Sequence, residues 1–99
     1  MDKISSGRRG HLRSIANGLK PTVILGKEGL TEKLLGNLTE QLKANELVKV
    51  KVLNNCPMDV QAAAEELASK TESHVVQVIG HVAVLYREAA ENPNPEYMV

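Results

Sequence analysis

The segment Gly26-Lys27-Glu28-Gly29, called the GKEG loop below, constrains the fold most because it separates two stretches of different character. Before it, the apolar run Pro21 to Leu25 predicts a buried strand in the interior of a sheet. After it, the run Leu30 to Leu35 predicts the start of a helix, with Thr31 as its N-cap.

Two glycines around a lysine suit phosphate binding at this position. Glycine lets backbone N–H groups approach a ligand closely, and the helix that follows offers free N–H donors and the positive end of its dipole. A structural turn with no ligand is the alternative, since short glycine motifs often occur without a function. The motif alone leaves both interpretations open.

The rest of the chain alternates between helical and extended periodicity. Apolar spacing predicts helices from Ser5 or Ser6 to about Ala16, from Thr31 to about Asn45, and from Asp59, as N-cap, to about Ser73. Strands are predicted at Thr22–Leu25, Glu46–Leu53, His74–Ile79 and Val82–Arg87, the last two joined by Gly80-His81 in a type II′ hairpin. The order αβαβαββ predicts an α/β domain of two-layer, α+β-like form, with a four-stranded mixed sheet packed against helices.

Length and composition limit the number of domains and the class of protein to which the chain can belong. Its 99 residues predict one domain over residues 1–90 and a loose acidic tail over residues 91–99. There is no apolar run long enough to span a membrane and no signal-peptide core, and the single Cys56 fits a reducing compartment. We therefore expect a cytoplasmic protein without a membrane partner.

The residue types needed for a metal site or for catalysis are not arranged in a usable pattern. His11, His74 and His81 lack metal-ligand spacing, and Cys56 has no second cysteine. No triad or pair of carboxylates can be assembled from the spacing, so neither a cofactor nor enzymatic activity is expected.

Charge is unevenly distributed along a chain whose formal net charge is zero. Residues 1–29 hold six basic and two acidic residues, and residues 30–99 hold six basic and ten acidic ones. The spacing of the first helix places Arg8, Arg9 and Arg13 toward solvent. Such asymmetry indicates an electrostatic binding end, but a helix with a basic solvent face explains it equally well.

Four blocks of the sequence together resemble a known family. They are the runs at residues 19–31 (LKPTVILGKEGLT), 46–52 (ELVKVKV), 76–80 (VQVIG) and 84–87 (VLYR). In order and spacing these blocks resemble the YhbY-type RNA-binding domain, also called the CRM (chloroplast RNA splicing and ribosome maturation) domain, in its bacterial single-domain form. The resemblance covers about residues 5–88.

The resemblance implies a fold similar to the C-terminal domain of the third bacterial translation initiation factor. It implies a non-enzymatic protein that binds structured RNA through the GxxG loop and nearby basic surface, in assembly of the large ribosomal subunit. Its ligand would be ribosomal RNA of the precursor subunit, with ribosomal proteins as further partners and no DNA. Carried over to this chain, the RNA-binding residues are Gly26, Lys27, Glu28, Gly29, Lys20, Arg8, Arg9 and Arg13.

Two other functions remain as alternatives. The chain could be a protein-interaction module that uses an exposed sheet face or its acidic C-terminal part. It could also be a small enzyme acting on RNA, with Glu28 or His81 as acid–base groups. Lys49 and Lys51 either join the RNA surface or lie on a solvated strand face, and the sequence does not decide between these roles.

Overall fold

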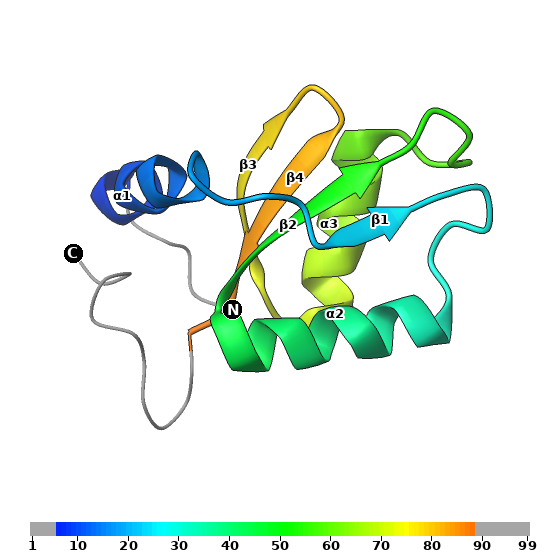
Figure 1. Cartoon of the computed structure of the whole chain (residues 1–99), viewed down its shortest axis with the longest axis horizontal. Coiled ribbons are helices and arrows are strands. Elements are labelled where there is room, and N and C mark those ends of the chain that lie inside the picture. The colour runs from blue at the N-terminus through cyan, green and yellow to red at the C-terminus, as the bar shows by residue number, and fades with distance from the viewer. Residues whose placement is uncertain (1–5, 89–99) are drawn as a thin grey trace.

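The computed structural model of the protein describes residues 6–88. Along the chain it contains α1 (Ser6–Ala16), β1 (Val23–Leu25), α2 (Glu32–Asn45), β2 (Leu47–Val52), α3 (Val60–Thr71), β3 (His74–Ile79) and β4 (Val82–Tyr86) (Figure 1). This is the predicted αβαβαββ order, and the predicted fold class is confirmed. The predicted tail at residues 91–99 lies outside the described residues.

The N-caps predicted at Thr31 and Asp59 are confirmed. The Thr31 Oγ1 accepts the N–H of Leu34 at 3.1 Å, and the Asp59 Oδ1 accepts the N–H of Ala62 at 2.8 Å. Each bond satisfies one of the donors that a helix leaves free in its first turn. The caps therefore fix where α2 and α3 begin.

The four strands form one mixed sheet in the order β1-β2-β4-β3. Strand β1 runs parallel to β2, and β4 runs antiparallel to both β2 and β3. At the β3–β4 turn Gly80 has a φ of +58°, as the first position of a type II′ turn requires. Because β4 pairs with β2 as well as with β3, it lies in the middle of the sheet.

The prediction that the first strand lies in the interior of the sheet is wrong, although its Val23 and Leu25 are buried as expected. Because β2 pairs with β4 on one side, β1 lies at the edge of the sheet, and its Ile24 is 59% exposed. The strand has three residues and follows Pro21, and short strands and proline are both typical of sheet edges. Apolar side chains on both faces of β1 therefore do not mean that both faces are covered.

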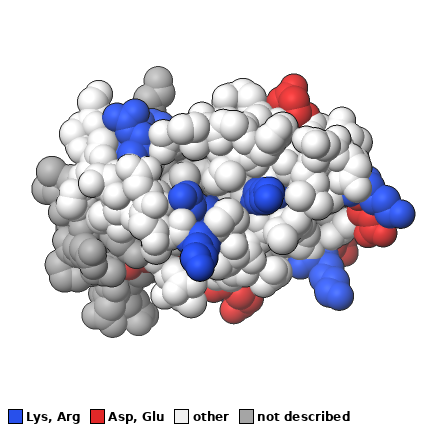
Figure 2. All heavy atoms as spheres, turned by 45° about the horizontal axis from the view of Figure 1, so that its top comes forward, with Lys and Arg blue, Asp and Glu red and all other residues white. Residues whose placement is uncertain are grey.

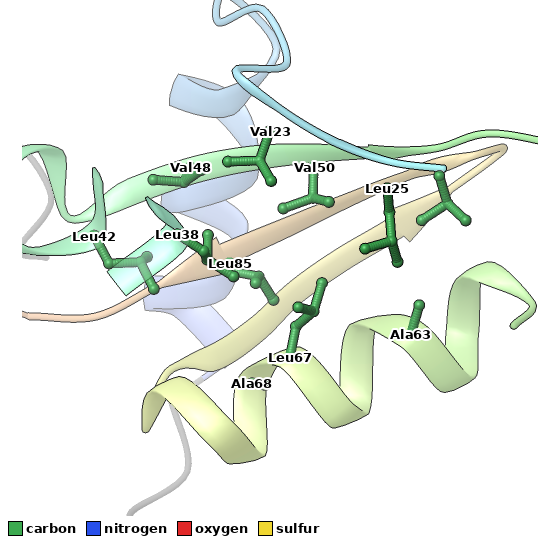
Figure 3. Packing of buried hydrophobic residues seen from close by; sticks show 11 residues of the cluster. Val23, Leu25, Leu38, Leu42, Val48, Val50, Ala63, Leu67, Ala68 and Leu85 are labelled. Atoms are coloured by element: carbon green, nitrogen blue, oxygen red, sulfur yellow. The ribbon is translucent and has the colours of Figure 1, made fainter. Parts of the chain in front are cut away.

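Helices α2 and α3 cover one face of the sheet and form the larger core with it. In Figure 3, Leu38 of α2 and Leu67 of α3 lie against the strand side chains; both leucines are fully buried. Fully burying one leucine side chain contributes about 1.5–3 kcal/mol. The buried members of this core are Val23, Leu25, Leu38, Leu42, Val48, Val50, Val52, Ala63, Leu67, Ala68 and Leu85.

Helix α1 packs on the opposite face and covers only one end of it (Figure 1). Its Leu12 and Ala16 bury themselves in a second cluster with Leu47, Val76, Val84 and Tyr86. Among residues 6–88, no helix covers the other end of this face. We call it the open sheet face, and it is defined by the side chains of Ile24, Lys51, Val82 and Ile79.

None of the helices within residues 6–88 combines the length and the hydropathy that crossing a bilayer requires.

Candidate nucleic-acid interface

The GKEG loop forms a tight turn at the end of the molecule remote from α1 (Figure 1). The N–H of Gly29 donates to the carbonyl oxygen of Gly26 at 3.0 Å, which closes the turn. Lys27 and Glu28 occupy its two central positions and are exposed. Gly29 is buried and has a φ of +67°, a conformation that favours glycine.

A second loop, residues 53–58, supports the GKEG loop from within the fold. The N–H of Leu53 donates to the carbonyl oxygen of Leu25 at 2.9 Å, and a Cβ built on Gly29 would lie 3.3 Å from Cγ of Pro57. The two loops meet because β1 and β2 are parallel, so that the C-terminal ends of both strands lie at the same end of the sheet. This contact was not predicted from the sequence, although parallel pairing of the two strands is the signal that predicts it.

Replacing Gly29 with alanine is expected to lower the free energy of unfolding by about 1–2 kcal/mol, because a Cβ is strained at positive φ and would press on Pro57. The matched control is Gly36→Ala in α2. Gly36 is exposed, and its added Cβ would meet no atom within 4 Å, so this change is expected to stabilise by about 0.5–1 kcal/mol. Urea unfolding of both variants measures the two effects. Equal shifts of the same sign would contradict the assigned conformation of the loop.

The loop borders a shallow hollow of about 280 Å³ that also includes Ile24, Thr31 and Leu34. The N-terminus of α2 lies beside it. Because Thr31 accepts the N–H of Leu34, the N–H groups of Glu32 and Lys33, like that of Thr31 itself, have no acceptor within the helix. Glycine backbone and helix N-terminus together form a geometry suited to a phosphate.

The loop itself supplies little net positive charge. Exposed Lys27 and Lys33 are balanced by exposed Glu28 and Glu32 within the same stretch. Attraction for a polyanion must therefore come from basic side chains elsewhere on the surface.

Two of the three arginines of α1 form hydrogen bonds to other parts of the same chain. Nη2 of Arg8 donates to the hydroxyl of Tyr86 at 2.7 Å and to Oε1 of Glu88 at 3.0 Å, and its guanidinium lies 5.1 Å from the centre of the Tyr86 ring. The prediction that Arg8 points freely to solvent is wrong, because this side chain ties α1 to β4. Arg13 is exposed, as predicted.

Arg9 donates hydrogen bonds to backbone carbonyl groups at a β-bulge in β3. The β3–β4 register shifts between Val75 and Gln77, and such a bulge leaves backbone groups without ladder partners. Nη1 of Arg9 donates to the carbonyl oxygens of Val75 at 2.6 Å and Val76 at 3.3 Å. The prediction of a freely solvated side chain is therefore wrong for Arg9 as well.

The buried contact around Tyr86 shifts two ionisations. Burial raises the pKa of Tyr86, with the charge of Arg8 opposing this and the charges of Glu46 and Glu88 adding to it. Burial lowers the pKa of Arg8, but the hydrogen bond and charge of Glu88 and the contact with Tyr86 outweigh that effect and raise it above its ordinary value. Arg8 therefore remains charged and Tyr86 neutral at physiological pH.

The lysines near the open sheet face divide into two kinds. Nζ of Lys49 donates to the carbonyl oxygen of Leu19 at 3.0 Å, so this half-buried lysine holds the segment between α1 and β1. Lys20 and Lys51 are exposed. Figure 2 shows Lys and Arg side chains spread over this side of the molecule, with acidic side chains mainly at its margins.

The eight predicted RNA-binding residues therefore do not form one cluster in the structure. The four loop residues lie at one end of the molecule and α1, with its arginines, lies at the other (Figure 1). One phosphate cannot be shared by the loop and the α1 arginines. Within residues 6–88, no three histidine, cysteine or acidic side chains are placed to hold a metal ion.

Comparison with known proteins gives agreement in sequence and in structure. The CRS1 / YhbY (CRM) domain model matches residues 4–87. The Bacillus subtilis protein named "Probable RNA-binding protein YqeI" is 39% identical over 93 residues, covering 94% of this chain and 97% of its own. A Haemophilus influenzae protein named "RNA-binding protein" is 36% identical over 91 residues, covering 92% of each chain. The solution structure of SAV1595 from Staphylococcus aureus has a TM-score of 0.78 at 38% identity and covers 91% of this chain and 94% of its own.

The match therefore extends over nearly the whole length of this chain and of these bacterial relatives. It confirms the resemblance found in the four sequence blocks, and the shared fold supports it independently. The chain belongs to the CRS1/YhbY (CRM) domain family.

Proposed function

We propose that this chain is a non-enzymatic RNA-binding protein that holds structured RNA at the GKEG loop. The observation that carries the proposal is the exposed turn itself, with Lys27 at its tip and the N-terminus of α2 beside it. The relatives named as RNA-binding proteins support RNA as the ligand.

Binding would combine local geometry with attraction over a wider surface. The loop backbone and α2 hold one phosphate, and exposed Lys27, Lys20 and Arg13 attract neighbouring phosphates without reading sequence. Arg8 and Arg9 contribute mainly by fixing α1 on the sheet, which positions Arg13. Selectivity then comes from the shape of the RNA.

We place this activity in the assembly of the large ribosomal subunit in the cytoplasm. Residues 1–90 would act as one RNA-binding unit, with precursor ribosomal RNA as ligand and ribosomal proteins as further partners. Low net charge supports a structured, defined target, because the chain lacks the overall positive charge that favours indiscriminate binding.

Crosslinking in cells, followed by sequencing of the bound RNA, tests this assignment. We expect a peak of crosslinks in precursor RNA of the large subunit, and a lower yield for a chain carrying Lys20→Gln and Lys27→Gln. Crosslinks spread evenly over all transcripts would contradict the assembly role. Association with ribosomal particles that survives complete ribonuclease digestion would favour a protein-interaction module instead.

A further inference from the structure

The open sheet face carries an unbroken row of side chains across all four strands. Ile24 pairs with Lys51, Lys51 pairs with Val82, and Val82 pairs with Ile79. Directly paired residues of neighbouring strands point to the same face of a sheet. These four side chains therefore form one line perpendicular to the strands, on the part of the face that α1 leaves uncovered.

The row is unusually apolar for a surface exposed to water. Ile24 is 59% exposed and Ile79 is 60% exposed, and Val82 between them is half-buried. Single exposed apolar residues are common, and they need no explanation. Here, however, the fold aligns three of them in register, where a one-sided sheet normally presents polar side chains to water.

The charges of this face select an anionic partner. Lys51 is exposed inside the row. The neighbouring row, Lys49, Val84 and Gln77, lies at the end on which α1 packs, with Val84 buried and Lys49 half-buried. None of these seven residues is acidic. Unpaired RNA combines apolar base faces with anionic phosphates, and it matches a row in which one lysine lies among three apolar side chains.

The row is also continuous with the GKEG loop. Ile24 is two residues before Gly26, and its side chain lines the hollow that the loop borders. Strands are spaced about 4.8 Å apart, so a row across four strands extends for about 14 Å, which is room for a few nucleotides. A chain of nucleotides leaving the loop would meet Ile24 first and Lys51 next.

We propose that Ile24, Lys51, Val82 and Ile79 bind an unpaired stretch of the same RNA that the GKEG loop holds, a step that rests on the proposed function. The isoleucines and Val82 pack against base faces, and the Lys51 ammonium contacts a phosphate. The ligand is thus a structured RNA with a single-stranded segment next to its helix.

The test compares two RNA probes, a blunt hairpin and the same hairpin with a short single-stranded extension. The wild-type chain is expected to bind the extended probe about tenfold more tightly, from burial of apolar surface on the row. The double variant Ile79→Thr with Val82→Thr keeps β-branched side chains and changes no residue that lines the hollow beside the GKEG loop. It should lose most of this preference while binding the blunt hairpin normally. Ile79→Val should retain most of the preference.

Lys51→Gln gives a second measurement. It should flatten the salt dependence of binding to the extended probe only. Lys70→Gln removes an exposed lysine, ion-paired with Glu66, from α3 on the other side of the sheet, and it should leave binding of both probes unaffected.

An unchanged preference in the threonine double variant would overturn the inference. So would a dimer of the wild-type chain that dissociates in this variant, since a second copy would then be the occupant of the row. Wild-type chain that binds the blunt hairpin but gains nothing from the extension would refute the inference alone. Failure to bind either probe would refute the proposed function as well.

Discussion

Replacing Lys20 and Lys27 together with glutamine is expected to weaken binding to structured RNA by about tenfold or more near 0.1 M salt. A lysine that neutralises a phosphate releases counterions, so each lost contact reduces the slope of log K against log[salt] by about 0.7–0.9. Both side chains are exposed, so the free energy of unfolding should change by less than about 0.5 kcal/mol. Titrations at several salt concentrations measure affinity and slope together.

The matched control removes the same amount of charge elsewhere. Lys43 of α2 and Lys70 of α3 are also exposed, and their helices cover the opposite face of the sheet. The variant Lys43→Gln with Lys70→Gln should bind nearly as the wild-type chain does. Equal losses in both double variants would mean that overall charge governs binding, and the assignment of the loop surface would fail.

Sequence patterns predicted the elements of this fold because their causes are local. Thr31 and Asp59 cap helices through bonds to residues three positions later, and alternation along β2 follows from strand geometry. The GKEG turn is local in the same sense, since its closing bond joins Gly29 to Gly26. These features need no knowledge of the rest of the chain.

The order of the strands depends on contacts that are distant in sequence. Whether β1 lies inside the sheet is decided by the pairing of β2 with β4, and the apolar sequence of β1 carries no information about that. The exposure of Ile24, and with it the open sheet face, could not be predicted from residues 21–25 alone.

The arrangement of the candidate site could be predicted only in part for the same reason. Its loop was found from local sequence, but its support by Pro57 and its separation from α1 are consequences of tertiary structure. The arginines show the limit most clearly: helical periodicity places Arg8 on a polar face, but its partner Tyr86 lies 78 residues away. A charged residue on a helix surface is not necessarily free.

Replacing both Arg8 and Arg9 with alanine is expected to lower the free energy of unfolding by about 2–4 kcal/mol. Hydrogen bonds that involve a charged group contribute about 1.5–3 kcal/mol each, and partial exposure of these side chains reduces that value. The change leaves the carbonyl groups at the β3 bulge without their donor and removes the cation that lies over the Tyr86 ring. Urea unfolding measures the loss.

Arg13→Ala is the control, because it removes the same side chain from an exposed position of the same helix and should change stability by less than about 0.5 kcal/mol.

The stabilising role of Arg8 and Arg9 and the role of Arg13 also differ in RNA binding. Loss of Arg13 should reduce the salt slope, whereas loss of Arg8 and Arg9 should lower apparent affinity mainly by depleting folded protein. A double variant as stable as the wild-type chain, with a reduced salt slope, would instead make Arg8 and Arg9 direct RNA ligands. Stability and salt slope measured on the same variants therefore separate the residues that build the surface from those that contact RNA.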